Sequence, residues 1–204
     1  LTLASFASNN GMSGKNVHLL ADIDLTGEVW QPIGSGSGKV SDVFANNWKA
    51  HFYGNFYGHN HVVSNMDTSA SEQGDKYSKF PQGFFGQIAS NGIVIDGLIL
   101  ENVKVVSNFY YNQGYAGAIV GDLGSNACTI SGCVVRGTIE ISAYHSGAIY
   151  GIGNSNIVNC KVIADEGSSI DGYVFAGGLV GAQRCSSTSN LNITGNTVSA
   201  ISAT

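Results

Sequence analysis

One short motif that ends in glycine returns five times along this chain, and it limits the folds that the chain can adopt. The motif occurs as HFYG, GFFG, GAIVG, GAIYG and GGLVG, ending at Gly54, Gly86, Gly121, Gly151 and Gly181. The intervals between these glycines are 32, 35, 30 and 30 residues. Repeats of this length bury their apolar faces by stacking on one another. The sequence therefore predicts a solenoid of similar layers.

Short alternating apolar runs inside each repeat indicate strands rather than helices. Segment Gly92–Val106 carries pairs of apolar residues two positions apart, separated by Asp96–Gly97 and by Glu101–Asn102. Runs of period 2 that are broken by turn-forming residues are typical of short strands meeting at corners. One layer of such strands buries its apolar side only against the next layer, and parallel stacking closes the backbone hydrogen bonds. We expect an all-β, right-handed parallel β-helix of about five coils.

Two sets of residues keep the same register from repeat to repeat. A ring lies six residues before each motif glycine, at Trp48, Phe80, Tyr115, His145 and Phe175. A β-branched apolar residue lies 6 to 12 positions after each glycine, at Val63, Ile95, Ile130, Ile157 and Ile193. Stacking predicts columns of these side chains at steps of ~4.8 Å. The column of rings either packs the interior or faces solvent as a stacking platform.

The chain is expected to form one domain, with the repeats over residues 48–204 and an N-terminal cap over residues 1–47. Leu3–Ser8 has helical spacing and precedes Asn9, so it predicts a short helix. Val17–Leu20 and Ile23–Leu25 alternate as a first pair of strands would. A solenoid end exposes core and strand edges, which is why a cap is expected there.

Composition excludes two classes of partner. Only 11 % of the residues are charged and the net charge is −5, so the chain lacks the basic patch that nucleic acid or an anionic membrane requires. No stretch approaches the ~18 consecutive apolar residues of a membrane-spanning helix.

Three stretches of sequence resemble the GLUG-motif proteins. They are ADIDLTGEVWQPIG at Ala21–Gly34, FYGHNHVVSNM at Phe56–Met66, and the repeated GAIVG, GAIYG and GGLVG. Two departures occur: Gly54 and Gly86 end aromatic runs, and His59-Asn60-His61 stands where the family commonly has Gly-Asn-Gly-His. The resemblance implies a β-helical segment of a larger bacterial surface protein, such as the non-catalytic part of some immunoglobulin A1 peptidases. It implies a secreted or surface-displayed module, often adhesive and flanked by further domains, and it supplies no catalytic residue.

Signatures of catalysis are missing from the sequence. The motifs HExxH and GxSxG and the phosphate-binding loop do not occur, so we expect no enzymatic activity, no cofactor and no metal. His59 and His61 could share a metal, although surface histidines near a turn explain them more simply. Asp22 and Asp24 could hold calcium or be solvated.

Cys133 and Cys160 occupy equivalent repeat positions, one strand spacing apart. Parallel Cβ vectors rarely give the torsion of a disulfide, so a buried ladder of free thiols is the first interpretation and a disulfide the second.

Aromatic residues before the motif glycines are the best candidates for ligand binding. They are Phe109, Tyr110, Tyr111, Tyr115, Tyr144 and Tyr173. Polar neighbours such as Asn108 and Gln113 suggest that residues 109–115 are exposed. Exposed rings would suit a glycan or a host or extracellular protein. A structural spacer that presents other domains is the alternative, and a carbohydrate-active β-helix enzyme is a second alternative.

Overall fold

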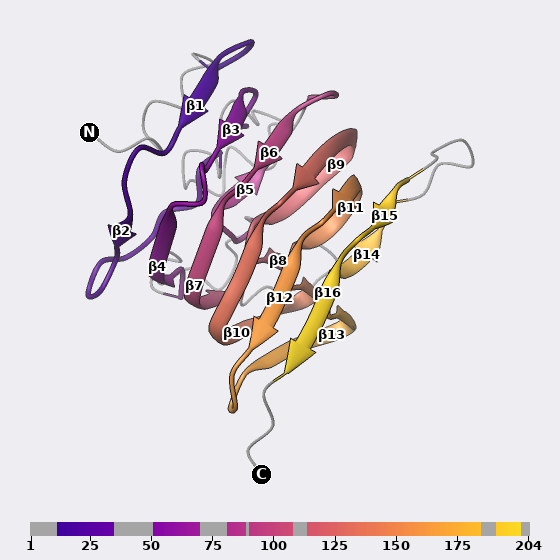
Figure 1. Cartoon of the computed structure of the whole chain (residues 1–204). Helices are drawn as coiled ribbons and strands as arrows, with labels where there is room; N and C mark the ends of the chain where they lie inside the picture. The colour runs from indigo at the N-terminus through magenta and orange to yellow at the C-terminus, as the bar shows by residue number, and fades with distance from the viewer. Residues whose placement is uncertain are drawn as a thin grey trace, which may run out of the picture.

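A computed structural model describes residues 12–34, 51–69, 81–88, 90–107, 114–184 and 191–200 of the chain. These residues contain strands and turns and no helix, and the strands form two curled sheets (Figure 1). Every strand pairing among them is parallel. The prediction of an all-β chain with parallel strands is thereby confirmed. The helix predicted at Leu3–Ser8 lies outside the described residues, and the right-handed β-helix stays a prediction.

Each sheet has eight strands within the described residues. The first sheet holds β1 (Asn16–His18), β3 (Asn55–Tyr57), β5 (Phe85–Gln87), β6 (Val94–Asp96), β9 (Val120–Ser131), β11 (Tyr150–Val158), β14 (Val180–Gln183) and β15 (Ile193–Thr194). The second holds β2 (Ile23–Asp24), β4 (Val62–Asp67), β7 (Ile99–Val106), β8 (Tyr115–Gly117), β10 (Val134–Gly147), β12 (Lys161–Ala164), β13 (Ser169–Gly177) and β16 (Thr197–Ala200).

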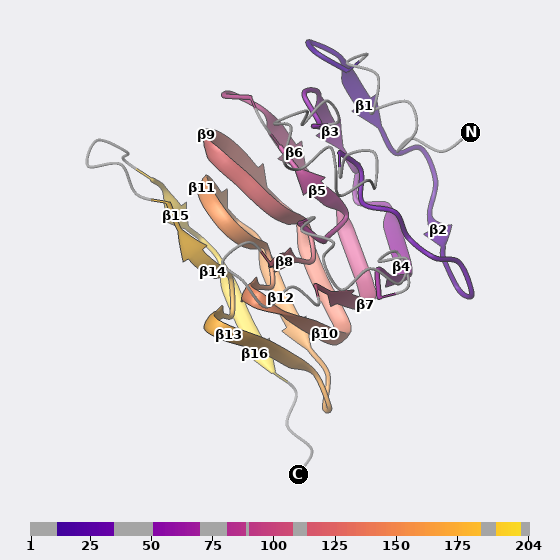
Figure 2. The same cartoon turned by 180° about the vertical axis from the view of Figure 1, so that it is seen from behind.

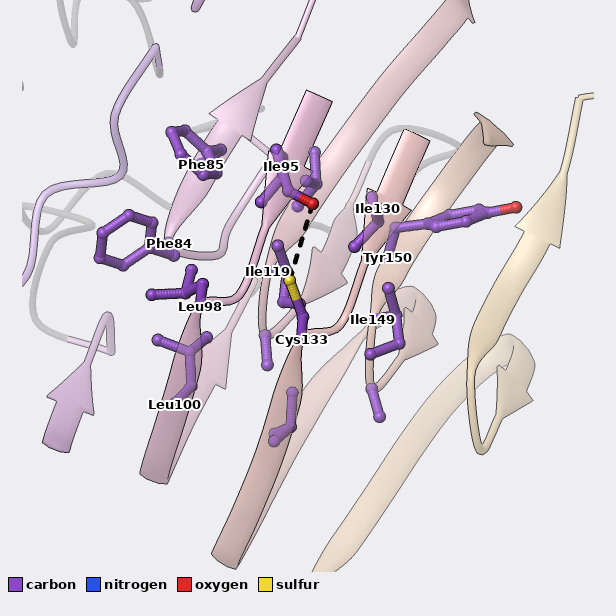
Figure 3. Close-up of a cluster of buried hydrophobic side chains, with 14 of the residues drawn as sticks. Phe84, Phe85, Ile95, Leu98, Leu100, Ile119, Ile130, Cys133, Ile149 and Tyr150 are labelled. Carbon is purple, nitrogen blue, oxygen red and sulfur yellow. Dashed lines mark hydrogen bonds between the residues drawn. The ribbon is translucent and has the colours of Figure 1, made fainter. Parts of the chain in front are cut away.

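The core consists of columns of apolar side chains that run across the strands. The parallel register places Ile95, Ile130, Ile157 and Ile193 side by side, as the repeat predicts. The first three are fully buried. The side chains of Ile95 and Ile130 lie among Leu98, Ile119 and Ile149 (Figure 3). Equivalent side chains meet because parallel pairing aligns one repeat with the next.

Asparagines shape one row of corners in the second sheet. Asn65 and Asn102 have positive φ, a conformation that Asn adopts more readily than bulkier residues. Asn102 accepts a hydrogen bond from the backbone N–H of Thr138 at 3.1 Å, and its amide donates to Asn65 Oδ1 at 3.4 Å. The Asn102 side chain therefore satisfies a backbone group of the following repeat where the strand ladder is interrupted.

The motif glycines allow neighbouring repeats to approach closely. A Cβ atom on Gly151 would lie 2.6 Å from the backbone nitrogen of Ala116, and one on Gly181 would lie 2.7 Å from that of Ser146. Both contacts are with backbone, which cannot move aside as a side chain could. Close packing is thus the reason that glycine recurs here.

The first repeat differs from the register that the motif spacing predicts. Val63 pairs with Leu100 rather than with Ile95, whose neighbour is Phe56. The backbone N–H of Gly86 donates to the carbonyl oxygen of Ile33, and Ile33 pairs with Phe85. The residue equivalent to Gly86 is therefore Gly34, which follows Ile33, and not Gly54. Gly54 has a different role, because a Cβ there would lie 2.9 Å from backbone oxygens of the first turn.

Three cysteines are buried free thiols, as the ladder interpretation predicts. Cys133 Sγ donates to the carbonyl of Ile95 at 3.8 Å (dashed in Figure 3), and Cys160 Sγ donates to the carbonyl of Ile130 at 3.5 Å. Cys128 is also free and buried, and burial raises the pKa of its thiol to about 12. These cysteines act as small apolar residues. Cys185 lies outside the described residues.

Candidate binding surface

Three rings stack across neighbouring strands, as the repeat register predicts. Tyr115 on β8 and Phe175 on β13 lie on either side of His145 on β10. The ring centroids are 5.5 Å apart between Tyr115 and His145 and 5.2 Å apart between His145 and Phe175, with interplanar angles of 14°. Such offset stacks stabilise beyond simple burial. The column is therefore a continuous ladder of flat rings.

A second, shorter ladder lies beside the first. Tyr144 stacks on Tyr173 with ring centroids 5.7 Å apart, and its edge meets His145 at 4.9 Å. The register between β10 and β13 shifts between Ala143 and His145. Such irregularities re-aim a side chain without ending the strand pairing. The shift falls at Tyr144, the β10 residue of the shorter ladder, directly before His145 of the longer ladder.

Exposure of the rings rises toward the end of the sheet. Tyr115 and His145 are each 8 % exposed, whereas Phe175 is 53 % and Tyr173 is 79 % exposed. Strand β13 pairs with β10, and no described strand pairs with its other edge. Figure 2 shows β13 at this end of the molecule. The ladder is thus interior at Tyr115 and reaches solvent at Phe175.

The expectation that Tyr115 is exposed is wrong. The guanidinium of Arg184 lies over its ring, 5.4 Å from the centroid, and His145 covers the ring on β10. Polar neighbours in the sequence were a poor guide, because the strand register decides which way the ring points. Phe109, Tyr110 and Tyr111 lie outside the described residues, as do Trp48 and Phe80.

An ion pair with the buried carboxylate of Asp122 holds the half-buried Arg184 in place. Its guanidinium nitrogens lie 3.1 Å and 3.3 Å from the two carboxylate oxygens of Asp122, which also accepts the backbone N–H of Gly124 at 2.6 Å. Asp122 is only 4 % exposed, and burial raises the pKa of its carboxyl although Arg184 acts in the opposite direction. Desolvation of the carboxylate therefore outweighs its attraction to the arginine.

Sequence reasoning missed this ion pair, although a signal was present. The residue after each motif glycine is Gln87, Asp122, Ile152 or Ala182 in the last four repeats. A single carboxylate at a repeat position that otherwise carries neutral residues indicates a charge with a local partner.

The rings of the ladder are uncharged near neutral pH. Burial lowers the pKa of His145, with a smaller effect in the same direction from Arg184. Burial also raises the pKa of Tyr115. Asp122 offsets the charge of Arg184 beside the ladder. The chemistry of the ladder is that of stacking, with a tyrosine hydroxyl available for hydrogen bonding.

The two histidines considered as metal ligands have different neighbours. His59 Nε2 lies 2.7 Å from Nδ1 of His18, whereas His61 Nδ1 lies 3.0 Å from a carboxylate oxygen of Asp22. Asp22 also accepts the backbone N–H of Val62 at 2.9 Å. Within the described ranges, no group of three or more His, Cys, Asp or Glu is placed to hold a metal ion.

Asp24, the other carboxylate considered for calcium, completes a turn. Its Oδ1 accepts the backbone N–H of Thr26 at 3.0 Å and the amide of Asn65 at 2.8 Å. Hydrogen bonding, first from Asn65 and then from Thr26, lowers the pKa of Asp24 to about 2. The carboxylate thus links β2 to β4 through hydrogen bonds.

The corner carboxylates Asp96 and Glu101 have partners on the next repeat. Asp96 accepts the hydroxyl of Ser131 at 2.5 Å, and Glu101 pairs with Arg136. These contacts run from repeat to repeat in the same way as the core columns.

Comparison of the chain with protein-family models, with curated proteins and with solved structures finds no match. The described residues include no helix with the length and apolar character needed to cross a bilayer.

Proposed function

We propose that this chain is a non-catalytic binding module of a bacterial surface or secreted protein, and that it recognises a glycan or a host or partner protein. Its fold in this proposal is a right-handed parallel β-helix of the GLUG type. The support for that fold is the parallel register of every described strand pair and the 30- to 35-residue repeat.

The exposed rings of Tyr173 and Phe175 carry the proposal. Contiguous exposed apolar surface, unlike single exposed side chains, marks binding sites. Here the two rings are 79 % and 53 % exposed, and each stacks on a ring of β10 that is more buried. They are therefore held in fixed orientations before a ligand arrives, which lowers the entropy cost of binding.

The chemistry of the surface favours a neutral, flat ligand. A sugar ring presents one apolar face of C–H groups, which packs on an aromatic ring, and hydroxyl groups that can bond the tyrosine oxygens. The neighbouring cation, Arg184, already pairs with Asp122 at 3.1 Å. Neutral glycans or extended peptides are thus preferred to polyanions.

A binding screen tests the proposal. The wild-type chain and a Tyr173→Ala/Phe175→Ala variant are screened against a glycan array and against extracellular-matrix proteins. Tyr57→Ala is the matched control, because Tyr57 is a half-buried tyrosine on β3, which lies next to β1, the strand at the opposite end of the first sheet. We expect the wild-type chain to bind a ligand in the screen. The affinity of the double variant for that ligand should be at least tenfold lower, and the affinity of the control should be unchanged. A Tyr110→Ala/Tyr111→Ala variant tests the rings predicted from sequence alone.

A structural spacer is the second candidate, and the continuous core favours it. One column of side chains runs without interruption from Ile23 through Leu100 and Val135 to Val198. A correctly folded wild-type chain that binds nothing in the screen would contradict the binding module and favour the spacer.

A further inference from the structure

Among the residues that the structure describes, the large exposed apolar side chains lie at the two opposite ends of the sheets. At the end with β1 and β2 the large ones are Leu20, Ile23 and Val29. At the end with β13 to β16 they are Tyr173, Val174, Phe175, Ile193 and Val198. The described residues of the intervening repeats expose no large hydrophobic side chain. Figures 1 and 2 show the two ends on opposite sides of the molecule.

The end strands have one neighbour each in the part of the chain that the structure describes. Strand β1 pairs with β3 and β2 with β4, whereas β15 pairs with β11 and β16 with β12. All of these pairings are parallel, so β1 and β15 run in the same direction within the first sheet, as do β2 and β16 within the second. An unpaired strand edge is a template for another chain. A second copy displaced along the sheets would add its β1 and β2 in parallel to β15 and β16.

Two core columns end at these strands, with exposed members at their last positions. The first column is Ile23, Val63, Leu100, Val135, Val162 and Val198. Its four inner residues are at most 1 % exposed, whereas Ile23 is 41 % and Val198 is 53 % exposed. The second column is Val17, Phe56, Ile95, Ile130, Ile157 and Ile193. Its last residue, Ile193, is 46 % exposed.

The spacing of the columns is alike at the two ends. Five residues lead from Ile193 to Val198 and six lead from Val17 to Ile23, while inner repeats use five to seven. Val198 of one copy can thus meet Ile23 of the next while Ile193 meets Val17. Both contacts are between aliphatic side chains of the type that pack inside the molecule.

Polar residues beside these columns are also compatible. Asp24 of one copy would lie beside Ser199 of the other. Ser199 occupies the same register position as Ser64, and within one chain the Ser64 hydroxyl lies 3.5 Å from Asp24 Oδ1. Asn16 would meet Asn192, much as the amide of Asn55 already donates to Asn16 Oδ1 at 3.0 Å. No charges of like sign face each other at these positions.

We infer that copies of this chain associate head to tail, with β15 and β16 of one copy against β1 and β2 of the next. The contact joins two different surfaces, so it leaves a free end after every addition and produces linear oligomers rather than a closed dimer. It continues both sheets and covers Ile23, Ile193 and Val198.

Sedimentation velocity of the full chain at increasing concentration tests the inference. Ile23→Lys blocks one end and Val198→Lys the other, because a lysine ammonium in the junction would lose its hydration without a partner. Thr138→Lys is the control, since Thr138 is exposed on an inner repeat. Circular dichroism confirms that each variant is folded.

We expect the wild type and Thr138→Lys to form species larger than dimers as the concentration rises, and each end variant alone to remain monomeric. An equal mixture of Ile23→Lys and Val198→Lys should form a dimer and stop there, because each variant supplies the end that the other lacks. A wild type that stays monomeric at every concentration overturns the inference. So does an end variant that dimerises alone, or a Thr138→Lys control that abolishes association.

Discussion

The same substitution should have very different costs at two positions of one core column. Ile130 lies between Ile95 and Ile157 and is fully buried, whereas Ile193 contacts the column on one side and is 46 % exposed. Replacing each by alanine removes identical atoms from nearly identical backbone. The difference in the free energy of unfolding then measures how much stability an added repeat contributes by covering the previous one.

The magnitude follows from burial. Truncation of a fully buried isoleucine to alanine costs about 2–5 kcal/mol, of which part is the cavity that remains. Fixed neighbours on both sides of Ile130 prevent collapse, so we expect about 3–4 kcal/mol there. At Ile193 roughly half of the transfer free energy is at stake and the gap opens to water, so the cost should be about 1 kcal/mol.

Urea unfolding followed by far-ultraviolet circular dichroism and by tryptophan fluorescence provides the measurement. Coincident curves from the two signals are needed before a single free energy is assigned, since repeat arrays can lose cooperativity. Equal losses at the two positions, or a larger loss at Ile193, would refute the argument that each repeat is stabilised by the one stacked on it.

Two further substitutions probe the motif glycine and the ring ladder. Gly151→Ala should destabilise the chain by more than ~2 kcal/mol in urea unfolding, because the new Cβ meets backbone of Ala116 at 2.6 Å. Gly178→Ala, whose Cβ meets only a side-chain methyl of Val198 at 3.1 Å, should cost less than half as much; similar costs would contradict the packing role of Gly151. Burial lowers the pKa of His145, so the unfolded chain takes up the proton first as the pH falls through about 6.5, and stability is lost below that value. His145→Phe should therefore gain stability relative to the wild type between about pH 7 and about pH 5 in thermal unfolding scans, and a constant difference would show that the imidazole does not titrate as argued.

The core columns could be predicted from sequence where each repeat keeps the same local pattern, although the interval between repeats varies. Ile95, Ile130, Ile157 and Ile193 each lie five positions before an apolar residue of the other column, and the same local pattern places Cys133 beside Cys160. The spacing of residues in the sequence does not predict how the repeat with Gly54 aligns with the next. Gly54 ends a run that matches the motif, but its close backbone contacts are with the carbonyl oxygens of Met12 and Lys15.

The candidate surface could be predicted only in part. The stack of Tyr115, His145 and Phe175 follows from their common offset before the motif glycine. Exposure does not follow from that offset, because it depends on whether a neighbouring strand or the side chain of Arg184 covers the ring. The ion pair with Asp122 joins residues of different repeats, which periodicity alone does not reveal.

The direction of the backbone hydrogen bonds has a mechanical consequence. These bonds point across the strands, along the line from β1 to β14 and from β2 to β16 (Figure 1). A force that pulls the two ends of the sheets apart acts on successive strand pairs in series, so each pair bears the whole load and the repeats separate one after another from the weakest. A force directed along the strands is shared by all the bonds of a pair at once. The molecule therefore resists shear far better than stretching, and under tension it would lengthen stepwise instead of breaking at a single point.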